Sequence, residues 1–155
     1  MENKDTFFVA VKVFLLDGKG NFLITEDRFG DWDIPGGRLR EQDFYTPLEQ
    51  VVERKIREEL GEELAYTLGS PRVYMRHERN ELLPTGEREK RRIFAIGYDA
   101  SYEGGEIKLG ENHENYEWVS LAGFQPETKF SGGWLQGVKD FQNLHNDLKD
   151  IKPGI

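Results

Sequence analysis

Two adjacent glutamates, Glu58 and Glu59, stand near the end of a predicted amphipathic helix. With 3.6 residues per turn, Glu59 and Lys55 fall inside the apolar stripe of this helix, and Glu58 lies at its edge. A carboxylate on an apolar face needs a partner, because burying a bare charge is unfavourable. Lys55, one turn earlier, could be that partner through a local ion pair. A divalent cation held by both glutamates is the alternative.

The helix that carries these glutamates is expected over residues 47–60. Thr46 is a favourable N-cap with the spacing of a capping box, and Gly61 is a natural end. Taken alone, this helix favours the local ion pair over the cation. Its context favours the cation, because a loop with two adjacent glycines, Gly36 and Gly37, leads into it.

Apolar runs separated by turn residues predict the strands. These runs cover residues 7–16, 22–25, 32–35, 72–78, 91–98 and 116–119. The charged residues 79–90, which include a proline and a glycine, are predicted as the long loop of a hairpin. Apolar residues at helical spacing from Trp134 to Ile151 predict a C-terminal amphipathic helix. Strands with two separately placed helices indicate an α/β fold, a sandwich around a mixed β-sheet.

The glycine loop and the first helix together resemble the signature of the Nudix hydrolases. That signature has a glycine, a spaced glutamate, and then Arg-Glu-apolar-any-Glu-Glu-any-Gly. Its opening glycine matches Gly37, and its closing half matches Arg54, Ile56, Glu58, Glu59 and Gly61. Residues 32–37 and 117–119 also resemble elements of the family. The resemblance implies a single Nudix-like α/β/α sandwich over residues 1–155.

This sequence departs from the signature at three places. The spacing from Gly37 to Arg54 is three residues longer than in the family, and the extra residues lie within 38–45. Thr46 occupies the place of the spaced glutamate. Lys55 occupies the place of the glutamate that follows the arginine, which in the family is often a metal ligand or the general base. Two helical carboxylates therefore remain instead of three.

Adjacent carboxylates suit Mg²⁺, which binds oxygen ligands near phosphates. The resemblance implies a requirement for Mg²⁺ or Mn²⁺, and a third carboxylate must then come from outside the helix. Residues 110–114 are similar in position to a family loop that supplies a ligand or a base. The candidate catalytic residues are Glu58, Glu59, Glu111 and Glu114, and the candidate metal ligands are Glu58, Glu59 and Glu111. Two carboxylates of the insertion are weaker candidates: Glu41 and Asp43.

The candidate substrate-binding residues are Gly36, Gly37, Arg54, Arg76 and Arg91. A basic cluster at residues 90–92, with Arg76 and Arg79 on the facing strand, could grip a diphosphate. The alternative, which we favour slightly, is a solvated hairpin balanced by its own glutamates. His113 could act as an acid or base, although a loop histidine more often only forms hydrogen bonds. Trp32 and Trp134 could stack on a base, but core packing is the better interpretation.

The composition limits the classes of function. The 155 residues include 29 acidic and 21 basic side chains, a net charge of −8, so we expect no binding to nucleic acid polymers or membranes. The absence of cysteine excludes disulfides and thiolate metal sites. The polar residues 1–5 contain no readable signal peptide, and we expect a cytoplasmic protein.

The resemblance implies hydrolysis of a nucleoside diphosphate linked to another group, a pyrophosphohydrolase reaction in which water attacks phosphorus. Substitution at a sugar carbon is a variant seen in relatives with altered signatures. The alternative is a catalytically weak or inactive domain that binds nucleotide or a protein partner. Lys55 and Thr46 favour that alternative, whereas Glu58, Glu59 and the glycine loop oppose it. The sequence leaves the oligomeric state open, a homodimer included.

Overall fold

The computed structural model describes residues 2–150, without the side chains of 147–150. Its strands are β1 (Phe8–Leu16), β2 (Asn21–Asp27), β3 (Trp32–Asp33), β4 (Gly36–Arg38), β5 (Ala65–Leu82), β6 (Arg88–Gly104) and β7 (His113–Ser120). Its helices are α1 (Leu48–Leu60) and α2 (Gly132–Asp150), with short 3-10 turns η1 (Glu41–Tyr45) and η2 (Pro126–Thr128). The predicted end of the last helix, Ile151, lies outside the described residues. None of the described helices is long and apolar enough to cross a membrane.

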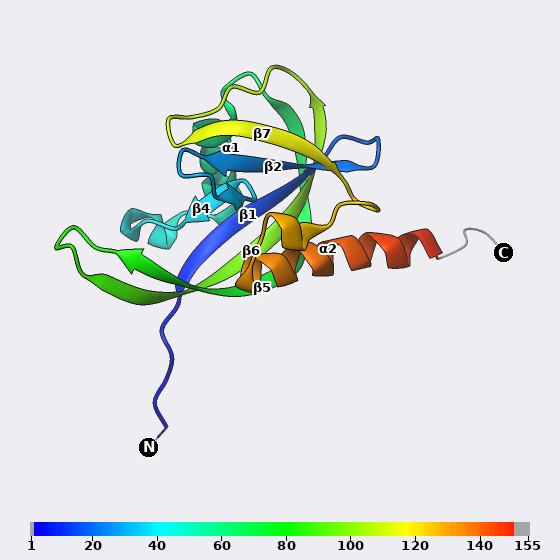
Figure 1. The fold of residues 1–155 in the computed structure, drawn as a ribbon. Helices are drawn as coiled ribbons and strands as arrows, with labels where there is room; N and C mark the ends of the chain where they lie inside the picture. Colours follow the sequence, from blue (N-terminus) through cyan, green and yellow to red (C-terminus); the bar gives the residue numbers. More distant parts are fainter. Residues whose placement is uncertain (1, 151–155) are drawn as a thin grey trace.

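The strands form one mixed sheet in the order β3-β2-β1-β6-β5, with β4 paired to β1 and β7 paired to β2 (Figure 1). β1 runs parallel to β6, and the other pairs are antiparallel. One edge of β1 pairs with β6, and its other edge is shared by β4 and β2. Its first half pairs with β4, from Ala10 to Lys12, whereas it meets β2 only where Leu16 lies opposite Phe22. The sheet is therefore split between β1 and β2, and residues 32–35 fill the gap.

The two faces of β1 belong to two separate cores, because successive side chains of a strand point to opposite sides. Val11, Val13 and Leu15 pack in the core beneath α1. Phe14 points the other way and stacks on Phe141 of α2, with 4.1 Å between the ring centroids. Helices therefore cover both faces of the sheet, which confirms the predicted α/β sandwich with a mixed sheet.

The first helix begins slightly later than predicted. Its N-cap is Pro47 rather than Thr46, and no side chain caps this end. The reciprocal capping contacts occur instead at η1, where the Asp43 carboxylate accepts a hydrogen bond from the Arg40 amide at 2.8 Å. The carbonyl of Pro47 accepts from the amides of Gln50 and Val51, so the extended residue before the helix closes its first turn.

The predicted long loop at residues 79–90 is mostly strand. β5 and β6 continue as a two-stranded ribbon in which Arg79 lies opposite Arg91 and Leu82 lies opposite Arg88. β1 begins at Phe8, opposite Ile93, so the outer part of the ribbon has no third strand beside it. Most side chains of this part are exposed, and they do not show the apolar alternation that indicates a strand.

Candidate active site

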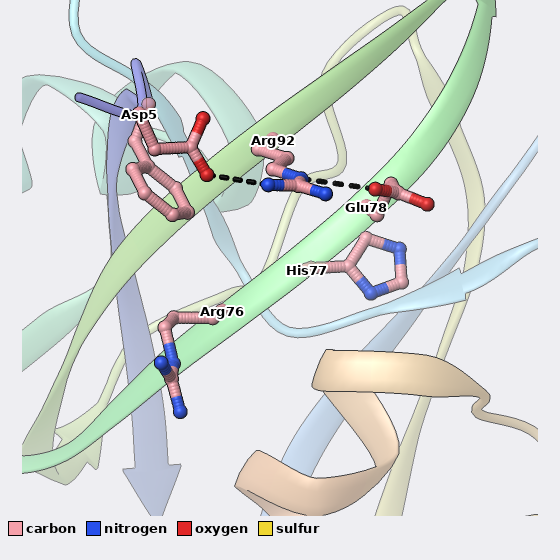
Figure 2. A pocket seen from close by; sticks show the side chains of 6 residues that line it. Asp5, Arg76, His77, Glu78 and Arg92 are labelled. Carbon is pink, nitrogen blue, oxygen red and sulfur yellow. Dashed lines mark hydrogen bonds and ion pairs between the residues drawn. The ribbon is translucent and has the colours of Figure 1, made fainter. Parts of the chain in front are cut away.

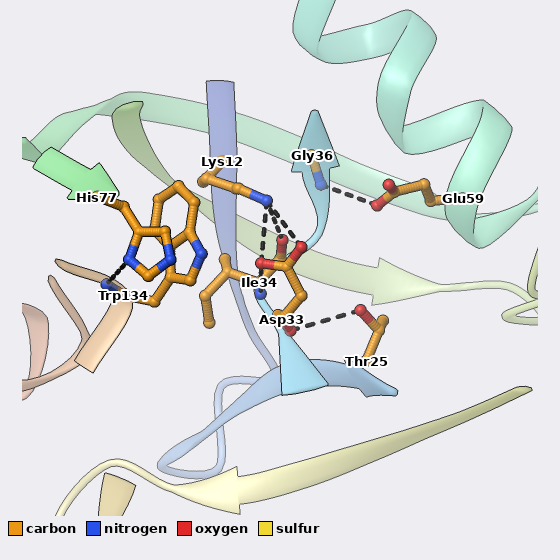
Figure 3. A network of polar contacts seen from close by, with 8 residues as sticks. All are labelled: Lys12, Thr25, Asp33, Ile34, Gly36, Glu59, His77 and Trp134. Atoms are coloured by element: carbon orange, nitrogen blue, oxygen red, sulfur yellow. Dashed lines mark hydrogen bonds and ion pairs between the residues drawn. The ribbon is translucent and has the colours of Figure 1, made fainter. Parts of the chain in front are cut away.

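The first of the paired glycines fits against β1 because a side chain at Gly36 would collide with the backbone of that strand. Gly36 has φ of +145°, and a Cβ atom there would lie 2.0 Å from the carbonyl oxygen of Val11. Its backbone amide donates a hydrogen bond to Oε2 of Glu59 at 2.8 Å (Figure 3). The glycine loop and the end of α1 are therefore joined through a glutamate side chain.

The carboxylate of Glu59 is mostly buried, and the positive charges near it do not fully compensate its negative charge. Burial raises the pKa of its carboxyl group to about 7, and the nearby Asp33 carboxylate contributes to the increase. The charge of Lys12, the amide of Gly36 and the charge of Lys55 oppose it only partly. A cation or a proton would relieve this imbalance.

A buried lysine in β1, which the sequence did not identify as a site residue, forms the centre of a polar network (Figure 3). The Nζ atom of Lys12 donates to both oxygens of Asp33 at 2.9 and 3.0 Å and to the carbonyl of Ile34 at 3.3 Å. It also lies 5.0 Å from the ring centroid of Trp134. The available sequence signal was a single lysine inside an otherwise apolar strand, next to a glycine loop.

Glu58 points into a different cluster of charges. Its Oε1 atom lies 3.0 Å from Arg40 and 3.6 Å from Arg54. The guanidinium group of Arg54 donates two hydrogen bonds, at 2.6 and 2.7 Å, to the buried carboxylate of Asp43. These bonds hold the pKa of Asp43 well below its usual range. Asp43 thus anchors the insertion to α1, and the geometry favours a positioning role for Arg54.

Lys55 lies against the glycine loop rather than beside a glutamate. A Cβ atom on Gly37 would come within 3.3 Å of the Cδ, Cε and Nζ atoms of Lys55. Within the described part of the chain, no carboxylate oxygen lies within 4.0 Å of this Nζ atom. The local ion pair between Lys55 and Glu59 is therefore not formed, and burial lowers the pKa of Lys55.

Two adjoining pockets open next to this loop. The smaller, about 110 Å³, is lined by Gly36, Gly37 and the cationic side chains of Lys12, Arg38 and Arg79. The larger, about 220 Å³, lies between the β2–β3 turn and the start of α2. The two pockets share Asp33, Arg79 and Trp134. Asp33 pairs with Lys12 and Glu81 pairs with Arg38, so within the described residues Arg79 is the cation of the smaller pocket with no direct ion pair and could bind a phosphate group.

Comparison with known proteins gives the family. The family model of the NUDIX domain matches residues 6–136. The chain belongs to the Nudix hydrolase family. Nucleoside triphosphatase NudI from Escherichia coli K12 is 30% identical over 111 residues, which cover 68% of this chain and 77% of that protein.

Solved structures show the same fold. The MutT protein from Methanosarcina mazei Go1 has a TM-score of 0.66 and 22% identity, covering 96% of this chain and 99% of that chain. The Escherichia coli dihydroneopterin triphosphate pyrophosphohydrolase has a TM-score of 0.63 and 15% identity, covering 90% of this chain and 99% of that chain. Both share the Nudix arrangement of a mixed sheet between helices.

The acidic segment before β7 docks on the end of the Nudix helix. The amide of Lys108 donates to the carbonyl of Leu60 at 2.8 Å, and the amide of Gly110 donates to the carbonyl of Glu59 at 3.1 Å. Glu111 and Glu114 follow directly, and both are exposed. Among the described side chains, no three histidine, aspartate or glutamate residues are grouped closely enough to hold a metal ion. The next residue after Asn112, His113, is half-buried, and burial lowers its pKa.

The arginines proposed to bind substrate lie in different surroundings. Arg91 is paired with Glu81 at 3.3 Å and Glu89 at 3.0 Å. It also lies over the ring of Phe8, 4.9 Å from the ring centroid. The charge of Arg91 is therefore balanced by glutamates of the ribbon, as the alternative interpretation of a solvated hairpin expects.

Arg76 lines a separate surface depression (Figure 2). There Arg92 is bonded to Asp5 at 2.5 Å and to Glu78 at 3.0 Å. The depression includes neither Gly36 nor Gly37. Of the arginines on this ribbon that the sequence singled out, Arg79 is the one that lines the pockets beside the Nudix loop.

Glu59→Gln is expected to stabilise the metal-free protein above pH 7. A carboxyl group whose pKa rises from 4.5 to about 7 on folding stabilises the fold fully below pH 4.5, and this contribution is lost as the pH rises through 7. The glutamine oxygen still accepts the Gly36 hydrogen bond. Melting temperatures in EDTA between pH 4.5 and 8 should diverge by several degrees at the alkaline end. Parallel curves would contradict the buried-charge interpretation, and Glu58→Gln is the matched control.

Asp43→Asn is expected to lower the melting temperature at pH 7, because it removes the charge that two Arg54 hydrogen bonds satisfy. A carboxyl group with a lowered pKa stabilises the fold above its ordinary range, and this contribution is lost as the pH falls through the folded-state value. The difference should therefore shrink in acid. Glu41→Gln, at an exposed carboxylate of the same turn, is the control. Equal melting temperatures for both variants would show that Asp43 does not anchor the insertion.

Proposed function

We propose that the protein hydrolyses a nucleoside diphosphate linked to another group, in the cytoplasm, with water attacking phosphorus. The observation that carries this proposal is the Glu59 carboxylate, which is held at the Gly36 amide beside a pocket lined by cations. The 30% identical NudI relative is named a nucleoside triphosphatase, which supports a nucleotide substrate. The test is a screen of nucleoside diphosphate derivatives with Mg²⁺ or Mn²⁺, scored by released phosphate or mononucleotide.

The chemistry of Glu59 suits a divalent cation, because this partly buried carboxylate is short of positive charge. Glu58 is paired with Arg40 and Glu111 is exposed, so both side chains would have to turn toward Glu59 to complete a set of oxygen ligands. We propose Glu58, Glu59 and Glu111 as the ligands of Mg²⁺ or Mn²⁺. When bound, the ion would polarise a phosphate oxygen and favour ionisation of the attacking water.

The side chains of this chain supply the remaining electrostatics. Lys12, Arg38 and Arg79 line the small pocket and would neutralise the phosphates, which lowers the barrier as negative charge shifts between oxygens. Asp33 holds the Lys12 ammonium group in one place, at 2.9 Å. Glu81 likewise holds the guanidinium group of Arg38, so two of the three positively charged groups are in position before substrate arrives, and this reduces reorganisation during the reaction.

A second candidate function is a Nudix domain that binds nucleotide with little turnover. Lys55 favours it, because its ammonium group lies against Gly37 in the position where the signature has a glutamate. That charge opposes a cation near the loop. The two candidate functions, catalysis at full rate and binding without turnover, predict different effects of removing the positive charge of Lys55.

Lys55→Glu is expected to tighten binding of Mg²⁺ or Mn²⁺ and to lower stability without metal, since it clusters three carboxylates. Metal titrations followed by melting temperature measure both effects, and Lys139→Glu on α2 repeats the charge change elsewhere. Increased hydrolysis would identify the natural protein as an attenuated, binding-type domain. Decreased hydrolysis would assign Lys55 a role at the substrate phosphates. Unchanged metal affinity would mean that residue 55 does not act on the site.

Glu111→Gln and Glu114→Gln test the third carboxylate. Loss of a general base or a metal ligand typically lowers turnover about 10²-fold or more, while the exposed positions should leave the melting temperature unchanged. Glu127→Gln, at an exposed carboxylate outside both pockets, is the control. Wild-type rates in both would exclude this loop and move the missing group to Glu41 in the insertion.

A further inference from the structure

Two of the charged side chains that line the larger pocket beside the Nudix loop are exposed and form no direct ion pair among the described residues. Five charged side chains line it: Asp27, Asp31, Asp33, Arg79 and Lys129. Asp27 accepts hydrogen bonds from the turn that follows it, Asp33 binds Lys12, and Lys129 lies 3.7 Å from Glu117. Within the described residues, the side chains of Arg79 and Asp31 have no hydrogen bond or ion pair.

Arg79 is one of several arginines near a single carboxylate, Glu81, whose pKa they lower. Arg79 lies directly opposite Arg91 in the ribbon, and like charges placed opposite each other destabilise a strand pair. Lys12 and Arg38 also line the smaller pocket, but Asp33 binds Lys12 and Glu81 binds Arg38. Arg38, Arg79 and Arg91 thus surround the one carboxylate of Glu81, and this local excess of positive charge favours an anion.

The aromatic rings of the pocket are already covered. Trp134 stacks on His77 with 4.4 Å between centroids, and the Lys12 ammonium group lies 5.0 Å from the Trp134 centroid. Trp32 carries the ammonium group of Lys129 at 4.0 Å, and the remainder of both indoles packs against the core beneath α2. His77 and Lys12 thus contact Trp134 and Lys129 contacts Trp32, which leaves less ring surface for stacking and favours recognition of a ligand through its polar edge.

We propose that Arg79 grips the substrate diphosphate at the junction of the two pockets, and that Asp31 selects the attached ring by accepting hydrogen bonds from its donors. This inference rests on the proposed function and refines it. A carboxylate accepts bonds from sugar hydroxyls or from the N–H groups of a base, so the shared requirement is a ring that carries donors. Arginine suits the phosphates, because its planar group can bond two oxygens at once.

The test for Arg79 measures affinity in EDTA, where the chain alone must bind the anion. The probes are UDP, CDP, ADP and GDP and their glucose esters, titrated by calorimetry. Arg79→Ala should weaken every probe about tenfold or more, as expected for a lost hydrogen bond to a charged group. Arg88→Ala, at the far end of the ribbon and outside both pockets, should bind as the wild type does.

The test for Asp31 is a change in selectivity. Asp31→Asn should weaken only some probes: the glucose esters if the pocket holds the sugar, or one set of bases if it holds the base. Glu127→Gln, an exposed carboxylate outside the pocket, is the control. A uniform gain in affinity would show that Asp31 only repels phosphate and would overturn its proposed role. No change would overturn it as well.

Failure of this inference differs from failure of the proposed function. If the variants change affinity as expected but no probe is hydrolysed with Mg²⁺ or Mn²⁺, the pocket assignment holds and the proposed reaction is wrong. If the wild type hydrolyses a probe and Arg79→Ala retains its kcat/KM, the reaction holds and the assignment of Arg79 is wrong. Absence of wild-type binding to all eight probes in EDTA would overturn the assignment too.

Discussion

The hydrogen bond from the Gly36 amide to the Glu59 carboxylate is the contact on which this site depends. It joins β4 to α1, two elements that are held apart by the whole insertion. The bond is available because Gly36 approaches β1 so closely that no side chain fits between them. The same hydrogen bond holds the carboxylate of Glu59 in a mostly buried position near Lys12 and Asp33. Geometry and electrostatics at the centre of the site therefore have one origin.

The sequence was sufficient for features that depend on neighbours along the chain. The strands around Phe14, the helix with Ile56 on its apolar face and the glycine loop each follow from local pattern. Contacts between distant segments were not predictable in this way. The position of Asp43 in the insertion gives no sign that its carboxylate will meet two nitrogens of Arg54, eleven residues on. Nor does Lys12 reveal Asp33 as its partner, because a split in the sheet brings them together.

The insertion adds charged contacts to the Nudix helix. Its η1 turn is fixed by the Asp43 carboxylate, and its Arg40 side chain pairs with Glu58. Lys55 then lies over Gly37 with no carboxylate at ion-pair distance among the described residues. The two helical glutamates thus have unlike surroundings, one balanced by arginines and the other short of positive charge. The motif suggests two equivalent acids, whereas in this chain Glu58 and Glu59 are chemically different groups.

The split between β1 and β2 has a consequence for how this protein can diverge. The side chains that line the larger pocket come from separate elements: Arg79 from β5, Asp31 from the turn before β3, and Lys129 from the segment before α2. None of these three side chains belongs to either apolar core. Each of these side chains can therefore be exchanged while the glycine loop and Glu59 stay fixed. In a substrate pocket of the kind proposed above, such exchanges would alter substrate preference without altering the motif, so these side chains would be a better guide to the substrate than the name of a relative.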